Sequence, residues 1–306
     1  MLFKSMLFVI LSSFGCLRVA QVHADTPPDE TPPVSTAPSS VEPATFHQQP
    51  ARVGDRVAQH VTTALDLQTT ILQSAKVANQ SSTRFSRQQK RFIEVLEVVE
   101  GRAKKAHVTF PLSRQHAPEN GVSSPETVQC VEGKSYIVVR QGNRLVVTDS
   151  SGAIPPQEEF SLVVNSLQSL GLPSPLVKYL LGRTVKIGEQ LQLPKQIAEE
   201  MLGVDGQLGK AEKFHLKLQE LKMVDEQPCA VFVATIEAQG DPDNPVTLRA
   251  RGEVLIQINT CRTVSAKLEG PLRMSTLEKT SEGEFEYKAQ GTMQVAIDSQ
   301  YGYAAK

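Results

Sequence analysis

Alternating apolar and polar residues fill the stretch from Thr247 to Met274, and this pattern predicts the architecture of the chain. A period of two places one apolar row and one polar row on opposite faces of a β-strand. The apolar row is formed by Leu248, Ala250, Gly252, Val254, Ile256 and Ile258 before the break, and by Val264, Ala266, Leu268, Leu272 and Met274 after it. Asn259–Arg262 separates the two runs and has the length of a turn, so the pattern predicts an antiparallel hairpin.

The same alternation predicts further strands on both sides of this hairpin. An early strand, led in by Gly54-Asp55, places Val57, Val61, Leu65 and Leu67 on one face. A second long strand runs to about Val99 and turns at Glu100-Gly101. Other strands are predicted at Ala106–Phe110 (ended by Pro111), Tyr136–Val139, Leu145–Val147, Val185–Leu193, Phe214–Leu218, Cys229–Ile236 and Phe285–Ile297. A loop is expected from Ser113 to Glu126.

Helical spacing is confined to three short segments. They are Phe160–Leu170, Pro173–Leu181 and Gln196–Leu202. The fold class predicted is therefore mainly β (α+β): a curved antiparallel sheet or half-barrel with two or three short helices on its apolar face.

The N-terminus indicates export. Lys4, the apolar run that begins at Met6, and small residues before Asp25 together resemble a signal peptide, predicted as residues 1–24. An alternative is a lipoprotein acylated at Cys16. The Pro-rich residues 25–50 are predicted to form a disordered tether, which leaves residues 51–306 as the β-rich folded region. We expect localisation in the periplasm or cell envelope, without integration into the membrane.

Two parts of the folded region resemble each other, residues 51–156 and 183–275. Val53-Gly54-Asp55 is similar to Ile187-Gly188-Glu189, and the strand–turn–strand at 91–110 parallels the one at 213–236. The segment that starts at Asn143 parallels the one that starts at Gly252. Generic strand alternation could produce the same likeness, so duplication is a hypothesis.

Composition narrows the function classes. The 306 residues carry a net charge of −1, which provides no basic field for nucleic acid. Cys130, Cys229 and Cys261 remain after export, which permits at most one intramolecular disulfide. Cys229 and Cys261 are the natural pair, but the expected register sets Cys229 opposite a residue near Val254. Buried free thiols are the alternative.

The sequence contains no constellation typical of catalysis. Nucleophile elbows, phosphate loops and paired zinc ligands are absent. The histidines of the folded region stand alone and are interpreted as surface residues: His60, His107, His116 and His215. Asp241, Asp243 and Asn244 offer oxygen ligands, but their spacing is that of a turn. We therefore expect no enzyme activity, no metal and no cofactor.

The most basic region lies around the turn at Gly101. It comprises Arg84, Arg87, Lys90, Arg91, Arg102, Lys104 and Lys105. Such a face could hold an anionic lipid headgroup or a polysaccharide. With Glu94, Glu97 and Glu100 nearby, it is interpreted as a solvated strand face.

The two successive helices offer a candidate ligand-binding feature. Their apolar residues Phe160, Val164, Leu167, Leu176 and Leu180 could form a lid over a cavity for a lipid or acyl chain. The alternative interpretation is that they complete the core.

Two short segments of the folded region resemble those of a known group of proteins. The element Gly188–Pro194 and the turn Ile258–Ala266, together with the export signal and the Pro-rich tether, resemble a family of uncharacterised exported proteins of planctomycete-type bacteria. In the turn, Asn259 and Cys261 replace the Asp and Gly of that family. The architecture is remotely similar to the half-barrels of periplasmic lipoprotein carriers, which implies binding of an apolar ligand.

The function predicted is an exported, non-catalytic envelope protein that binds or carries an apolar ligand or a lipidated partner. The alternative is a structural or adhesive interaction module without a small-molecule ligand. Its partners would be lipid or envelope proteins, not nucleic acid.

Overall fold

A computed structural model describes residues 43–117, 125–172, 174–202, 210–240, 245–280 and 283–302. These residues form one twelve-stranded antiparallel sheet, a second sheet of two strands, and three helices. The mainly β prediction is confirmed. The large sheet contains β2 (Arg56–Gln73), β3 (Lys76–Val99), β4 (Arg102–His116), β5 (Thr127–Val128), β6 (Lys134–Gln141), β7 (Arg144–Asp149), β9 (Gln190–Gln192), β10 (Lys210–Val224), β11 (Gln227–Gln239), β12 (Val246–Gln257), β13 (Thr263–Thr280) and β14 (Gly283–Gly302).

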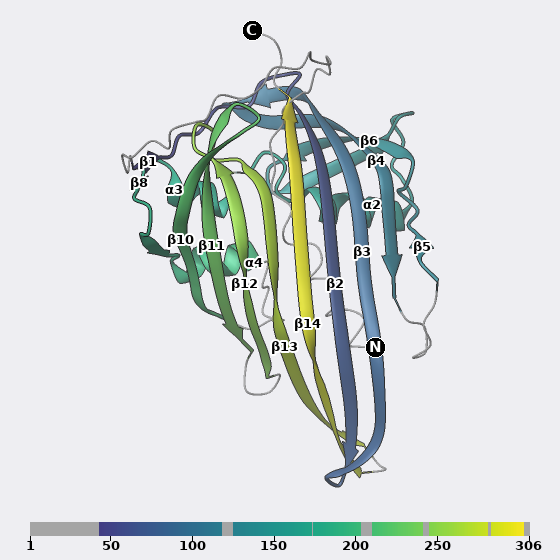
Figure 1. Cartoon of the computed structure of the whole chain (residues 1–306). Coiled ribbons are helices and arrows are strands. Elements are labelled where there is room, and N and C mark those ends of the chain that lie inside the picture. Colours follow the sequence, from purple (N-terminus) through teal and green to yellow (C-terminus); the bar gives the residue numbers. More distant parts are fainter. Residues whose placement is uncertain are drawn as a thin grey trace, which may run out of the picture.

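The strand order of the large sheet is β7-β6-β4-β3-β2-β14-β13-β12-β11-β10-β9, with β5 beside β4. Neighbours in this order are mostly neighbours in sequence, joined by hairpins. The pairing of β14 with β2 differs, because it joins the last strand of the large sheet to its first, from Phe285↔Gln73 to Gly302↔Arg56. Figure 1 shows these two strands side by side in the middle of the sheet. This pairing joins the first and last strands of the large sheet, so that the sheet is continuous.

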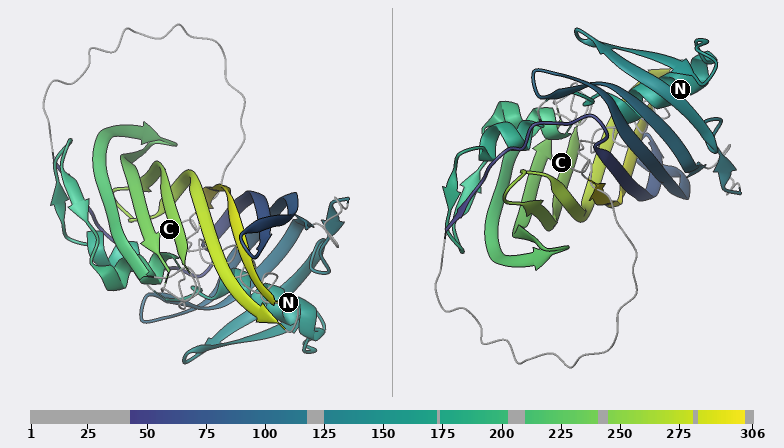
Figure 2. Two further views of the ribbon diagram at one scale, coloured as in Figure 1. Left: turned by 90° about the horizontal axis from the view of Figure 1, so that it is seen from below. Right: turned by 90° about the horizontal axis from the view of Figure 1, so that it is seen from above.

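One face of the sheet, here called the inner face, carries the helices. The helix α2 (Gln157–Leu167) packs with β3, β4, β6 and β7 in one apolar cluster. The helices α3 (Pro175–Leu180) and α4 (Lys195–Leu202) belong to a larger cluster over β10 to β14 and part of β2. In Figure 2, α3 and α4 lie beside the green strands and α2 beside the teal strands. The sheet therefore has two apolar cores on the same face.

Three glycines allow the sheet to coil tightly. Gly252, Gly270 and Gly291 lie on the inner face of β12, β13 and β14. A Cβ at Gly252 would stand 1.7 Å from the Lys267 carbonyl oxygen, and a Cβ at Gly291 would stand 1.7 Å from that of Asp66. Since only glycine permits so close an approach of neighbouring strands, these positions set the curvature of the sheet.

The last part of the predicted tether belongs to the fold, which corrects the expected boundary at residue 50. Ala44–Thr45 forms β1, which pairs with β8 (Thr184–Val185), and Phe46 is fully buried. The backbone then bonds from His47 to Ile258 and from Ala51 to Gly101. Residues 43–51, here called the N-terminal strap, thus cross one end of the sheet (Figure 1). Residues 1–42, with the predicted signal peptide and Cys16, lie outside the described residues.

Two further predictions need correction. Strand β4 does not end at Pro111 but runs to His116, because Pro111 sits at a bulge between Thr109 and Leu112, where its missing N–H costs no regular ladder bond. The strand predicted over Val185–Leu193 is split into β8 and β9 by a turn at Lys186–Glu189, where Gly188 has φ 84°. The helix predicted from Pro173 begins at Pro175, and Pro173 itself lies outside the described residues.

No helix among the described residues is long and apolar enough to cross a membrane.

Candidate functional site

Buried polar side chains separate the two apolar cores. They lie on the inner face of β2, β3, β4 and β14, on α2 and just after β5, and we call them the polar seam: Gln59, Gln89, Arg91, Ser113, Gln129, Ser166 and Ser299. Their hydrogen bonds run from one to the next: Gln59 to Ser299 at 3.2 Å, Arg91 to Gln59 at 2.8 Å, Ser166 to Gln89 at 3.0 Å and Gln89 to Ser113 at 3.1 Å. The seam is thus a connected network, in which the hydrogen bonds offset the desolvation cost of burying polar groups.

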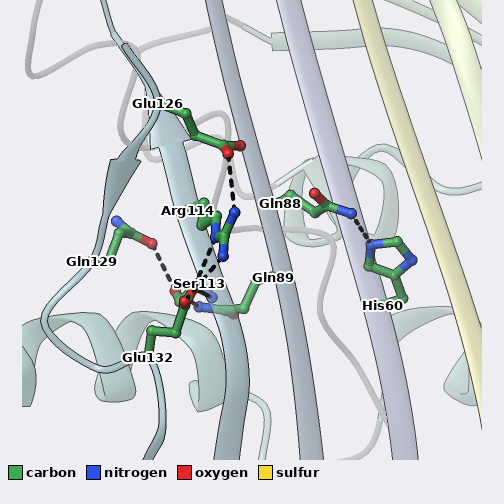
Figure 3. A network of polar contacts seen from close by, with 8 residues as sticks. All are labelled: His60, Gln88, Gln89, Ser113, Arg114, Glu126, Gln129 and Glu132. Atoms are coloured by element: carbon green, nitrogen blue, oxygen red, sulfur yellow. Dashed lines mark hydrogen bonds and ion pairs between the residues drawn. The ribbon is translucent and has the colours of Figure 1, made fainter.

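The polar seam gives no sign of an activated nucleophile. Ser113 accepts a hydrogen bond from Gln89 and donates one to Gln129 at 2.8 Å, so its neighbours are amides (Figure 3). Next along β4, Arg114 points to Glu126 and Glu132. Glu132 also accepts from the Ser113 N–H at 2.8 Å, which together with Arg114 holds the pKa of this carboxyl below its usual range. These contacts fasten the segment that begins at residue 125 to β4.

Buried arginines hold the C-terminal end of α2. The guanidinium of Arg91 donates to the Ser166 carbonyl, and that of Arg140 donates to the carbonyls of Gln168 and Leu170. The last carbonyls of a helix lack intrahelical partners and carry partial negative charge, so they match a cation. At the first turn, Glu159 accepts from Lys134 at 2.5 Å and from Tyr136 at 2.7 Å. Helix α2 is therefore fixed to the sheet at both ends.

A pocket of about 710 Å³ opens beside the polar seam, across β3, β2, β14, β13 and β12. Its middle row is one rung of the sheet on the inner face, composed of Arg87, Thr63, Val295, Leu268 and Gly252. The flanking residues come from the neighbouring rungs and are Thr62, Ala64, Ser86, Gln88, Arg251, Glu253, Lys267, Glu269, Gln294 and Ala296, with Glu126 at one end. The volume lies within the range of about 300–1,000 Å³ that is typical of ligand sites.

Two of these residues carry unsatisfied polar atoms. Among the described residues, the Nε and Nη2 atoms of Arg87 and the Oγ1 atom of Thr63 have no hydrogen-bond partner, and all three are shielded from solvent. Arg87 and Thr63 stand directly opposite each other in the register of β2 and β3. Burial lowers the pKa of the Arg87 guanidinium to about 10, which leaves it charged at neutral pH. Arg87 and Thr63 are therefore the residues of the pocket lining whose shielded polar atoms lack hydrogen-bond partners.

The five candidate lid residues do not face one common space. Leu167 is buried under α2 with Phe160 and Val164 half-buried beside it, all in the cluster over β3 to β7. Leu176 and Leu180 of α3 belong to the other cluster, over β10 to β14. A role in ligand binding stays a prediction for these residues, and the pocket described above has a different lining.

The other candidate residues are scattered. The histidines are half-buried and lie on three strands, on the face opposite the inner face: His60 on β2, His107 and His116 on β4, and His215 on β10. His60 pairs with Gln88 at 2.9 Å (Figure 3), and burial together with Lys90 lowers its pKa. No three His, Cys, Asp or Glu residues of the described part of the chain gather into a potential metal site. Asp241, Asp243 and Asn244 lie outside the described residues.

The three cysteines within the described residues, Cys130, Cys229 and Cys261, are free thiols. Cys229 stands opposite Gln257, three residues from the position near Val254 that we expected. It packs with Val231 and Leu255 on the outer face, whereas Cys261 belongs to the inner core, so the sheet separates them. Burial raises the pKa of Cys229 to about 11 and that of Cys261 to about 12.

The basic region is not a single solvated face, as the sequence suggested. Arg91 is only 2% exposed and Arg87 is half-buried with its Nε and Nη2 atoms shielded, whereas Arg84 and Lys90 are exposed on the opposite face of the same strand. The alternation along the strand held the signal that was missed. Arg87 and Arg91 lie on the same face of the strand as Phe85 and Ile93, and these apolar residues indicate that this face is the inner one. A charged residue on the apolar phase of a strand is therefore the clue that our interpretation overlooked.

Comparison with known proteins assigns no family. No family model matches the chain, and no curated protein matches it. Among solved structures, the chain is similar to lipovitellin, described as "lipid-protein interactions in lipovitellin", with a TM-score of 0.36, 11% identity and coverage of 83% of this chain but 26% of that one. It is also similar to DynF from the dynemicin biosynthesis pathway of Micromonospora chersina (TM-score 0.20, 7% identity, coverage 94% and 96%).

A LolA-superfamily protein from Nitrosomonas europaea matches with a TM-score of 0.13 and 8% identity, over 80% of this chain and 87% of that one. These scores are too low to carry a functional argument. The resemblance to exported planctomycete-type proteins receives no support from the comparisons and stays a prediction.

Proposed function

We propose that the chain is an exported, non-catalytic envelope protein that binds an amphipathic, lipid-like ligand on the inner face of its sheet. The observation that carries the proposal is the pocket of about 710 Å³, which combines apolar side chains with polar groups that lack partners. Ligand sites typically have volumes of about 300–1,000 Å³, apolar walls and a few placed polar groups.

The neighbourhood of the pocket suits an aliphatic chain. Val295 and Leu268 line it directly, and Val61 and Leu65 flank Thr63 on the inner face of β2. Beyond them lies the larger apolar core of the sheet. A ligand with a polar end in the pocket would therefore have apolar surface beside it for its chain.

Native mass spectrometry tests this function. The full chain is exported from a bacterial host, purified without detergent, and measured before and after organic extraction. The expected result is an additional extractable mass of lipid size, or a mass gain when the extracted protein is mixed with oleate. A bare polypeptide mass that does not change on addition of oleate or phospholipid would refute the proposal.

One observation favours the alternative of an interaction module. The ends of β2, β3, β13 and β14 extend beyond the rest of the sheet (Figure 1), with Val77 61% and Leu277 56% exposed. Exposed strands with apolar side chains favour contact with another protein. The outcome that refutes ligand binding in the experiment above would leave this alternative as the working hypothesis.

A further inference from the structure

The inner face of the sheet carries three arginines around the polar seam, and two of them have protein partners. Arg91 and Arg140 donate to carbonyls at the C-terminal end of α2. Arg87 lies on the same phase of β3 as Arg91, four residues away, and within the described residues its Nε and Nη2 atoms bond to nothing. The sheet thus presents three similar cations, and in one of them two shielded N–H-bearing nitrogens have no acceptor among the described residues.

The other charged residues of the pocket lining on β12 and β13 lie in the neighbouring rungs, whose side chains alternate to the opposite face of the sheet, and each has an opposite charge across the register. Arg251 stands opposite Glu269, and Lys267 stands opposite Glu253. Glu126 pairs with Arg114 at 3.5 Å. In contrast, the residues opposite Arg87 are Thr63 on β2 and Gln115 on β4, both neutral. Arg87 is therefore the cation of this pocket that lacks a compensating carboxylate across the ladder.

Shielded guanidinium N–H groups without an acceptor are unfavourable, because they have lost their hydration without gaining a partner. Native proteins rarely retain such a group unless something else satisfies it. Arginine is suited to this role because its planar fork binds carboxylate or phosphate through two parallel hydrogen bonds. The Thr63 hydroxyl, opposite it, is a further unused donor.

We propose that Arg87 and Thr63 bind the anionic head group, a carboxylate or a phosphate, of an amphipathic ligand. The proposal rests on the function proposed above and specifies the chemistry of that ligand. The adjacent apolar residues Val295 and Leu268 would contact the first part of its chain. The pocket would then discriminate between lipids that share a chain and differ in head-group charge.

Matched ligands test the proposal. Binding of oleate, oleyl alcohol and oleyl phosphate, which share one chain, to the full chain is measured by isothermal titration calorimetry. The wild-type protein is expected to bind oleate or oleyl phosphate at least about tenfold more tightly than oleyl alcohol, the scale of one charge-assisted hydrogen bond. The preferred anion identifies the head group as carboxylate or phosphate.

Three variants locate the effect. Arg87→Gln should abolish the preference for the anion while retaining the affinity for oleyl alcohol, and Thr63→Val should weaken anion binding a few-fold. Arg84→Gln is the matched control: it removes a positive charge from the same strand, but from an exposed side chain paired with Asp66. Since Arg87→Gln removes an uncompensated charge, it is not expected to impair folding, which circular dichroism and thermal unfolding verify.

The outcomes separate the two proposals. If the wild-type protein binds oleate and oleyl alcohol equally, or if Arg87→Gln keeps the preference for the anion, the head-group assignment is overturned and ligand binding stands. If the wild-type protein binds none of the three ligands, the proposed function itself fails, and the head-group assignment fails with it.

Discussion

Each buried or half-buried charged side chain in this protein has its own kind of partner, and the kind of partner determines the expected effect of a substitution. Arg91 and Arg140 meet helix carbonyls, Asp55 meets Arg262, and Glu159 meets a lysine and a tyrosine. These interactions differ in solvent exposure, and the exposure decides how much each contributes to the free energy of unfolding.

The buried ion pair should matter more than an exposed one. Asp55 and Arg262 lie 3.6 Å apart with side chains 1% and 3% exposed, and Arg262 also stacks over the Tyr301 ring at 5.4 Å. Arg262→Met leaves the Asp55 carboxylate buried without its cation, so we expect a loss of about 3–5 kcal/mol in the free energy of unfolding. Chemical denaturation measures it.

The control for this substitution is Arg56→Met. Arg56 pairs with Glu94 at 2.8 Å, but the two side chains are 51% and 35% exposed. Its loss should cost less than about 1 kcal/mol. Equal losses for the two variants would contradict the assignment of the Asp55–Arg262 pair as a buried electrostatic link.

The contact at the first turn of α2 predicts a pH dependence. Hydrogen bonds from Lys134 and Tyr136 hold the pKa of Glu159 below its usual value. A carboxyl whose pKa is lower in the folded state stabilises the fold above its unfolded pKa, and this contribution is lost as the pH falls through the folded pKa. Glu159→Gln should therefore cost about 1 kcal/mol at pH 7, after discounting for partial solvent exposure.

The difference between wild type and Glu159→Gln should shrink as the pH falls below about 4.3, the ordinary pKa of a glutamate. Urea denaturation at pH 7, 5, 4 and 3 follows it. A difference that stays constant from pH 7 to pH 3 would show that the carboxylate's charge is not what holds α2.

At the scale of elements, the coil of the sheet depends on glycine. We expect Gly252→Ala to destabilise the protein by about 2–3 kcal/mol, because a Cβ there would stand 1.7 Å from the Lys267 carbonyl oxygen and the strands would have to separate. Thermal unfolding measures the loss. The neighbouring Glu253→Ala, an exposed residue of the same strand, serves as control and should change stability by less than about 0.5 kcal/mol. Equal stability of Gly252→Ala and wild type would mean that β12 and β13 relax freely.

Two turns are alike in detail and bear on the duplication hypothesis. Gly54 and Gly188 both have φ 84°. The Gly54 N–H donates to the Val95 carbonyl, and the Val95 N–H donates to the Asp55 carbonyl. In the second turn, the Gly188 N–H donates to Leu218, and the Leu218 N–H donates to Glu189. Each acidic side chain also accepts from the residue three before it, at 3.1 Å and 2.9 Å. The likeness supports duplication, which stays a hypothesis.

The elements followed from the sequence where the period of two was strict. The hairpin of β12 and β13 and the strands β2, β6, β7 and β14 are confirmed, since alternation alone specifies them. The prediction from alternation failed where proline or glycine lies in the strand. Pro111 did not end β4, and Gly188 broke the strand expected over Val185–Leu193. The pairing of β14 with β2 joins residues more than two hundred positions apart, and no local pattern encodes it.

The candidate site was harder to predict than the fold. The lid residues were read correctly as apolar, but their division between two cores depends on the strand order. Arg87 was named within a basic run whose net charge suggested solvent exposure, whereas its strand phase places it inside. Both points required knowledge of which strands are neighbours.

At the scale of the whole molecule, the N-terminal strap links the two halves of the sheet. It begins at β1 beside β8, contacts Ile258 between β12 and β13, and reaches Gly101 between β3 and β4. Phe46 is fully buried within it and lies 5.9 Å from Phe232 between ring centroids. A chain that begins at residue 51 would therefore lose a strand, a core aromatic side chain and a connection across the sheet end.

Truncation tests this role. A chain that begins at residue 43 should keep the stability of the full chain, because it retains every described contact, whereas one that begins at residue 51 should unfold at much lower denaturant concentration. Phe46→Ala in the full chain isolates the side chain and should cost about 3–5 kcal/mol, the range for burying and then deleting a core aromatic residue. Guanidinium denaturation followed by circular dichroism compares the four proteins. If the chain that begins at residue 51 is as stable as the one that begins at residue 43, the strap lies on the sheet without supporting it, and the boundary drawn from proline content alone was the correct one.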